Sequence, residues 1–299
     1  MKLRGDEFGR VFNASGGRNL TGIGYPFHKW LGPIGPNYDG STFIAKTTTF
    51  HPREGNMPLL EDGETPREML PKCIYVNFFR AITLNAVGLS GPGFEAILDT
   101  GRLQQRTDPF ILSFMPAGST LEERQAEERL YVDMLKRRKS EFRAKIAIQR
   151  NFSCPNVGQD PSELIEESHS SFEVLGELDI PLIAKINAEV SPKAAVKVAK
   201  HPMCDAICNS NTIFWLHMPD LIRWWWLFPW QHLFHGGRSP LQVRGLEQPG
   251  GLGGRPLYPI VRDWIRDARA AGFTKPIMAC GGLLSKRSIR GVARAGASA

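Results

Sequence analysis

The sequence predicts an α/β fold in which parallel strands alternate with helices, and two observations support this prediction. Short apolar runs typical of buried strands recur along the chain, and helix-like segments of about ten or more residues separate them. Polar or glycine-rich segments directly follow these runs. Repeated strand–helix units form a barrel or a doubly wound sheet, and polar residues at successive strand ends favour the barrel.

The individual elements can be assigned from these patterns. The expected strands are Phe110–Phe114, Lys145–Ile148, Pro181–Ile186, Ala206–Cys208 and Pro276–Ala279. The expected helices are Thr120–Arg138, Pro161–Leu178, Ser191–Lys200 and Leu257–Ala271.

Composition is that of an ordinary globular protein, with 299 residues, 42% hydrophobic and 22% charged. One large domain over residues 1–299 fits this length, and so do two smaller ones. The five cysteines are scattered, and neither they nor the histidines show metal-ligand spacing, so we expect reduced thiols and no metal. We see no signal peptide or membrane anchor, and we expect a cytoplasmic protein.

The formal net charge of +7 raises the question of an acidic partner. Part of this charge is the run Lys136–Lys139, which follows Glu122, Glu123, Glu127 and Glu128 on one expected helix. Acidic residues early and basic residues late suit the helix dipole. A solvated helix face is therefore favoured over a nucleic-acid patch, and no nucleic-acid partner is expected.

Cys154 is the first candidate for chemistry. It lies in a short polar loop after an expected strand, between Ser153 and Pro155, with Asn151 and Asn156 on either side. An accessible thiolate can act as a base or nucleophile. The asparagines offer donors and acceptors suited to a flat ring with imide and carboxylate groups.

Two lysines interrupt apolar runs. Lys185 ends Pro181–Ile186, and Lys46 follows Thr42–Ala45. Because lysine is rarely buried without a partner, we expect each to meet a ligand or, alternatively, a carboxylate of the protein.

Glycines form two further candidate segments. The run Gly250–Gly254 reads as a turn that opens the helix near Pro256, and Gly281–Gly282 follows the last expected strand. Glycine lets backbone N–H groups approach an anion, and a helix N-terminus adds its dipole. Together they predict a phosphate cradle, although neither matches a Walker or Rossmann spacing.

Taken together, these segments resemble the dihydroorotate dehydrogenases of the soluble class that uses a catalytic cysteine. The most specific match is Asn151-Phe152-Ser153-Cys154-Pro155-Asn156, which resembles the family's Asn-Leu-Ser-Cys-Pro-Asn loop. The resemblance runs over residues 13–299. Its other segments are Asn13–Gly16, Ala45–Thr49, Pro52–Asn56 and Asn85–Leu89.

The resemblance implies a single (β/α)8 TIM-type barrel that binds FMN and oxidises dihydroorotate to orotate in pyrimidine biosynthesis. Cys154 would remove a proton from the substrate ring while a hydride passes to flavin N5. The implied substrate contacts are Lys46, Asn85, Val87, Gly88, Leu89, Asn151, Asn156, Asn211 and Thr212. The implied FMN contacts are Ala14, Ser15, Gly16, Lys46, Thr47, Lys185, Gly253, Gly254, Cys280, Gly281 and Gly282. Asn209–Ser210 is a rival register for Asn211–Thr212.

Three features depart from the family pattern. Residues 1–11 do not resemble its opening hairpin, and the chain ends at Ala299, so the last strand and helix are expected to be missing. A tryptophan-rich insertion spans about residues 213–249, and it could be a lid, a dimer surface or a membrane-surface contact.

The alternatives are oxidoreduction of another dihydropyrimidine, or a truncated barrel without catalysis. The electron acceptor stays open among fumarate, a quinone and NAD through a partner subunit. The two glycine segments favour the fumarate-using subclass. The resemblance also suggests a homodimer.

Overall fold

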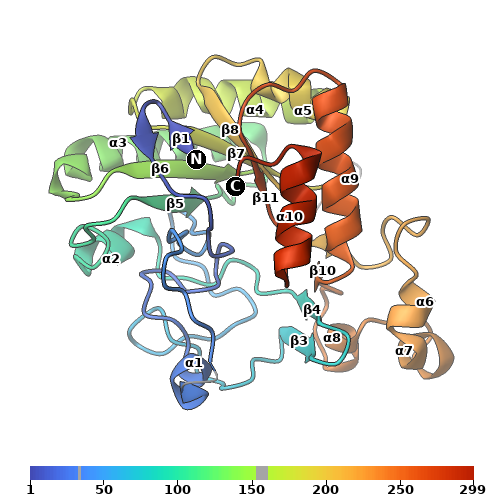
Figure 1. Cartoon of the computed structure of the whole chain (residues 1–299). Coiled ribbons are helices and arrows are strands. Elements are labelled where there is room, and N and C mark those ends of the chain that lie inside the picture. The colour runs from blue at the N-terminus through green and yellow to red at the C-terminus, as the bar shows by residue number, and fades with distance from the viewer. Residues whose placement is uncertain (33–34, 153–160) are drawn as a thin grey trace.

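A parallel sheet of five strands in the order β11-β8-β7-β6-β5 forms the centre of the computed structural model, which describes residues 1–32, 35–152 and 161–299 (Figure 1). Every strand and helix expected from the sequence is present, with ends shifted by a few residues. The strands are β5 (Phe110–Phe114), β6 (Ile146–Asn151), β7 (Leu182–Ile186), β8 (Cys204–Asn209) and β11 (Ile277–Ala279).

Helices connect successive strands and pack against one another in chain order along the outer face of this sheet. The longest, α3, begins with a capping box in which Thr120 and Glu123 bond each other's backbone. The helices are α3 (Leu121–Arg138), α4 (Pro161–Gly176), α5 (Pro192–Ala199), α9 (Leu257–Ala270) and α10 (Lys286–Ala295), with a 3₁₀ turn at Lys139–Glu141.

Successive side chains of each strand point to opposite faces of the sheet, and both faces are apolar. In β7, Leu182 and Ala184 face the helices, whereas Ile183 packs in a separate inner cluster. The same inner cluster takes one or two residues from each neighbouring strand. Its strand members are Ile111, Ala147, Ile183, Ala206, Cys208 and Met278.

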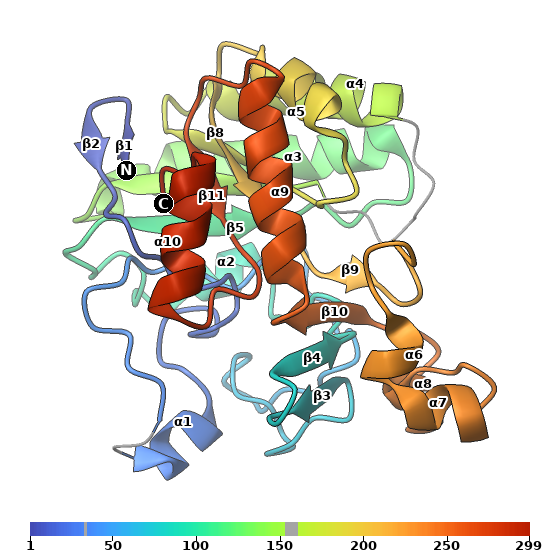
Figure 2. The same ribbon diagram turned by 45° about the vertical axis from the view of Figure 1, so that its right-hand side comes forward.

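Further segments extend the parallel arrangement beyond both edges of the sheet. Ile44 and Thr48 form parallel bridges with β5, and Phe12 bridges Thr42. At the other edge, the backbone N–H of Ala279 donates to the carbonyl of Ala299 over 2.8 Å. Figures 1 and 2 show the two ends of the chain on the same side of the molecule.

The start of the chain corrects one expectation. The strands β1 (Lys2–Leu3) and β2 (Asp6–Glu7) form an antiparallel hairpin. Arg4 and Gly5 connect them with φ of 46° and 91°, the backbone of a two-residue hairpin turn. Arg-Gly is a weaker turn signal than Asn-Gly, so the hairpin was missed. Leu3 and Phe8 cover the inner cluster.

A second, antiparallel sheet has the order β3-β4-β10-β9 and lies at one end of the molecule (Figure 2). The run Gly250–Gly254 was expected as a turn, but Gly251–Gly254 is the central strand β10. A Cβ on Gly254 would lie 2.2 Å from the carbonyl oxygen of Ala81, so glycine permits the close strand packing. The other strands are β3 (Ile74–Asn77), β4 (Ile82–Asn85) and β9 (Ile213–Phe214).

The remaining helices are short: α1 (Pro26–Trp30), α2 (Phe94–Asp99), α6 (Trp224–Leu227), α7 (Pro229–Phe234) and α8 (Pro240–Val243). The last three belong to the tryptophan-rich insertion, which packs beside the antiparallel sheet (Figure 2). In the described ranges, none of the helices combines the length and apolar character needed to cross a membrane.

The inner cluster generates a stability prediction. Ile183 is fully buried, so Ile183→Ala should leave a cavity and lower the free energy of unfolding by about 2–5 kcal/mol. Leu130→Ala, on the exposed side of α3, should change it by less than about 1 kcal/mol. Urea unfolding of both variants checks this. Equal losses would contradict an inner core.

Candidate active site

A cleft of about 2110 Å³ opens at the carboxyl ends of the parallel strands. It collects every described residue among the implied substrate and FMN contacts, while Cys154 and Asn156 lie outside the described residues. The lining residues of that set are Ala14, Ser15, Gly16, Lys46, Thr47, Asn85, Val87, Gly88, Leu89, Asn151, Lys185, Asn211, Thr212, Gly253, Gly254, Cys280, Gly281 and Gly282.

Lys46 joins two parts of this cleft. Its side chain is 8% exposed, and its Nζ donates to the backbone carbonyl of Ser90, directly after the Asn85–Leu89 loop. Burial lowers the pKa of Lys46 to about 8. The ammonium has no carboxylate partner among the described residues, so an anionic ligand could bind it.

The segment Pro52–Asn56, which also carries the family resemblance, contacts the Asn85–Leu89 loop. The N–H of Asn56 donates to the carbonyl of Val87 over 2.8 Å, and its side chain donates to Ala86 over 2.7 Å. Gly55 has φ of 57°, and a Cβ there would lie 2.3 Å from Oγ of Ser90. Glycine at this position lets the two loops approach each other.

A row of hydroxyl groups runs from the lining of the cleft to buried Ser113 on β5. The Oγ of Ser15 lies 3.1 Å from Oγ1 of Thr47, which lies 2.8 Å from Oγ of Ser113. Gln149 lines the cleft next to this row. Sequence reasoning missed Gln149, although it lies two residues before Asn151 on β6 and therefore shares its face.

Two asparagines from different strand ends meet directly. The Nδ2 of Asn211 donates to Oδ1 of Asn151 over 2.7 Å. Asn187 donates to the carbonyl of Thr212 over 3.0 Å and so secures the same loop. In the rival register, Ser210 lines the cleft but Asn209 is fully buried, which favours Asn211 as the residue facing a ligand.

Lys185 is the second buried cation of the cleft. It lies on β7 opposite Cys208 of β8 and is 7% exposed, without an ion pair in the described part of the chain. The thiols of Cys208 and Cys280 hydrogen-bond each other, which raises the pKa of Cys208 and lowers that of Cys280, and Lys185 favours the Cys280 thiolate. The alternative of a carboxylate partner for Lys185 is not observed there.

The glycine segments form a backbone surface suited to an anion. Gly281 and Gly282 have φ of 121° and 69°, and within the described residues their N–H groups donate no hydrogen bond. A Cβ on Gly282 would lie 2.7 Å from the N of Tyr258 in the first turn of α9. Free N–H groups beside the N-terminus of a 14-residue helix attract negative charge.

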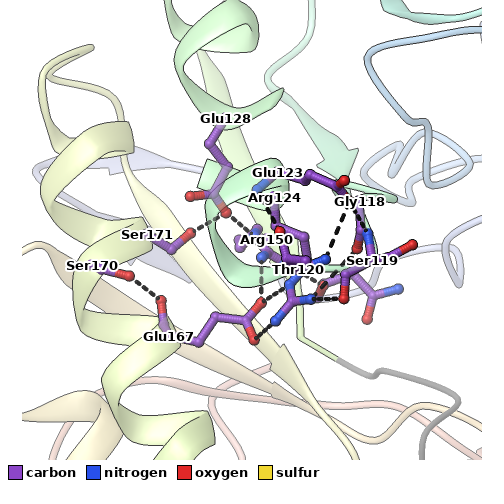
Figure 3. A network of polar contacts seen from close by, with 11 residues as sticks. Gly118, Ser119, Thr120, Glu123, Arg124, Glu128, Arg150, Glu167, Ser170 and Ser171 are labelled. Atoms are coloured by element: carbon purple, nitrogen blue, oxygen red, sulfur yellow. Dashed lines mark hydrogen bonds and ion pairs between the residues drawn. The ribbon is translucent and has the colours of Figure 1, made fainter. Parts of the chain in front are cut away.

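Behind the cleft, a buried ion network anchors β6 to its helices (Figure 3). Arg150 is 1% exposed, and its guanidinium lies 2.6 Å from Glu128 of α3 and 3.0 Å from Glu167 of α4. Ser171 donates to Glu128 over 2.7 Å, and Arg124 lies 3.0 Å from Glu167.

This network corrects the expectation for Glu128, which was assigned to a solvated helix face. The basic end of that face is exposed as expected, with Lys136 paired to Glu177 at 2.5 Å. Arg150 also donates to the carbonyl of Asn151, so it holds the strand end from which Asn151 enters the cleft. Sequence reasoning missed it because a single arginine in a strand carries no local signal of its partners.

The network predicts an asymmetric response to substitution. Arg150→Met should lower the free energy of unfolding by about 3–5 kcal/mol, because it leaves Glu128 buried without its cation. Arg137→Met on the exposed face of α3 should change it by roughly 0.5 kcal/mol or less. Urea unfolding measures both, and the double variant Arg150→Met/Glu128→Met should recover part of the loss. A stable Arg150→Met single variant would contradict the assignment.

No family model matches the chain, but curated proteins are similar to it. The dihydroorotate dehydrogenase B (NAD(+)) catalytic subunit of Thermotoga maritima is 28% identical over 197 residues, 64% of this chain and 63% of that protein. The subunits with the same name from Geobacillus kaustophilus and Streptococcus pneumoniae are 28% and 27% identical, over 86% and 88% of this chain and 70% and 73% of theirs.

The chain thus spans about 63% of the length of the Thermotoga relative. The glycine segments had favoured the fumarate-using subclass, whereas these relatives are named for NAD(+). All the relatives described share one enzyme name, and the resemblance seen in the motifs points to the same enzyme. The chain is therefore similar to catalytic subunits of dihydroorotate dehydrogenases, at 27–28% identity over 64–88% of its length.

Proposed function

We propose that this protein is an FMN-dependent dihydroorotate dehydrogenase that oxidises dihydroorotate to orotate. The observation that carries the proposal is the single cleft that brings together Lys46, the Asn151–Asn211 pair and the glycine segments. The names of the relatives support the reaction.

The proposal includes a single (β/α)8 barrel over residues 1–299. Its support is the parallel sheet β5–β6–β7–β8–β11 together with the bridged segments on both sides of it. An inner cluster ringed by consecutive strands is the packing that barrels require.

The donor set of the cleft fits FMN. The phosphate would bind the free N–H groups of Gly281 and Gly282, with Gly253 and Gly254 beside them and the α9 dipole behind. The flavin ring would lie against Lys185 and the row of hydroxyl groups. The other ring contacts in this proposal are Ala14, Ser15, Gly16, Lys46, Thr47 and Cys280. Bound FMN would supply the hydride acceptor.

The cleft has room for substrate as well as cofactor, because its volume of about 2110 Å³ exceeds the ~300–1,000 Å³ typical of a single-ligand pocket. Lys46 would hold the substrate carboxylate, and the asparagine amides would bond the imide. The substrate set is Lys46, Asn85, Val87, Gly88, Leu89, Asn151, Asn156, Asn211 and Thr212. These groups orient the ring, which is the main contribution of the protein.

Cys154 is proposed as the general base. Its thiolate would take the proton from the ring carbon next to the one that loses hydride. Support comes from its position three residues after Asn151 in the matching loop. The names of the relatives favour NAD(+) over fumarate as the final acceptor. The expectations of a cytoplasmic protein and of a homodimer stay predictions.

The visible spectrum tests this function. Protein mixed with FMN should hold the flavin through gel filtration, and anaerobic dihydroorotate should bleach it. Cys154→Ser should slow bleaching at neutral pH by about 10²–10⁴-fold because serine is a far weaker base. Cys204→Ser, outside the cleft, should bleach at the parent rate.

The other outcomes separate the alternatives. Flavin binding without bleaching would replace dihydroorotate with another dihydropyrimidine such as dihydrouracil. A folded protein that FMN does not reconstitute would instead point to a non-catalytic barrel.

A second prediction concerns pH. Below its pKa of about 8, Lys46 is an ammonium that attracts the orotate carboxylate, and above it the charge is lost. The Kd of the FMN-loaded protein for orotate should therefore be flat from pH 6 to 7 and rise by up to about tenfold per unit above pH 8. Lys46→Arg keeps its charge and should remove the rise. Titration of the flavin spectrum measures Kd, and the same rise in the arginine variant would contradict this role.

A further inference from the structure

The tryptophan-rich insertion carries a group of apolar side chains that project into solvent from α6 and α7. Trp225, Trp226 and Trp230 are 62%, 57% and 65% exposed, and Leu233 and Phe234 are 72% and 65% exposed. We call these five residues the aromatic face. Large apolar side chains are usually buried away from water, so five exposed ones on two neighbouring helices indicate an interaction surface.

The insertion is nevertheless firmly folded. The rings of Trp215, Trp224 and Phe228 are buried and pack together, with the Trp215 centroid 5.0 Å from that of Trp224 and 4.8 Å from that of Phe228. The indole N–H of Trp224 donates to the carbonyl of His217 over 2.7 Å. The aromatic face is therefore the outer side of an anchored structure.

A second segment joins the aromatic face from a distant part of the sequence. Phe78 and Phe79, at the turn between β3 and β4, are 86% and 99% exposed. The next residue, Arg80, donates to the carbonyl of Leu227 over 2.8 Å, and its guanidinium lies 5.1 Å from the Trp226 ring centroid.

The stretch of sequence that carries the aromatic face has charged side chains of one sign. Residues 221–246 contain Arg223, Arg238 and Arg244 together with two histidines, and no aspartate or glutamate. The flanking carboxylates are Asp220 and Glu247, at the two ends of this stretch. Arg80, whose guanidinium lies against the Trp226 ring, adds a fourth arginine.

We propose that the aromatic face and the Phe78–Phe79 turn dock this protein onto an anionic phospholipid surface. Tryptophan and phenylalanine side chains prefer the boundary between headgroups and acyl chains, and arginines beside them bind anionic headgroups. The rings stand outward on short helices and a turn tip, which suits insertion between lipids. Arginines without carboxylates along residues 221–246 complement anionic lipid headgroups, which favours a lipid surface over a protein partner. This inference does not depend on the proposed reaction.

Vesicle sedimentation of the full chain tests the proposal. The protein should bind phosphatidylglycerol/phosphatidylcholine vesicles and bind pure phosphatidylcholine at least about tenfold more weakly, with binding that falls as salt rises. The triple variant Trp226→Ala/Trp230→Ala/Phe234→Ala should lose most of the binding, and Arg223→Gln should weaken it. Trp30 on α1 is 76% exposed and lies outside the aromatic face. Trp30→Ala is therefore the matched control and should bind like the parent.

Thermal unfolding and the FMN spectrum of each variant show whether it is folded. A folded parent protein that does not bind anionic vesicles would overturn the proposal. So would equal binding by the triple variant and the parent. If the triple variant instead abolishes a dimer seen in sedimentation equilibrium, with no vesicle binding by the parent, the face buries a second copy of the chain.

Discussion

The parallel alignment of β5, β6, β7, β8 and β11 is the constraint on which the rest of the structure depends. Because these strands run in one direction, their carboxyl ends meet at one edge, and the loops that follow them converge. Residues far apart in sequence, such as Asn151 and Asn211, then come within hydrogen-bonding distance. The alignment is stable because both faces of the strands are apolar, one covered by helices and the other filled by the inner cluster.

Buried cations within this framework fall into two kinds. Arg150 lies between two carboxylates and a backbone carbonyl, which compensates its charge within the protein. Lys46 and Lys185 face the cleft and form no ion pair with a carboxylate in the described part of the chain, and Lys46 has a pKa lowered by burial. The first kind joins β6 to its helices. The second is suited to a ligand that brings negative charge.

The match between pattern and structure is closest where the signal is local. The five parallel strands and the helices α3, α4, α5 and α9 were predicted because short apolar runs and helical spacing need only neighbouring residues. The hairpin β1–β2 and the glycine strand β10 were missed, since neither carries the usual turn or β-branched residues. Gly251–Gly254 is a strand only because β4 and β9 lie on either side of it.

Sequence patterns were thus sufficient to predict the alternation of strands and helices. They also indicated the resemblance to dihydroorotate dehydrogenases and the residues that line the cleft, since both rest on short motifs at strand ends. Three features required the folded chain: the Asn151–Asn211 contact, the burial of Glu128 under Arg150 and the exposure of Trp225, Trp226 and Trp230 beside buried Trp224. Each joins or separates residues by packing between distant segments. Residues of the same type in one stretch can therefore lie in the core or at the surface, because packing against distant segments decides which of them are covered.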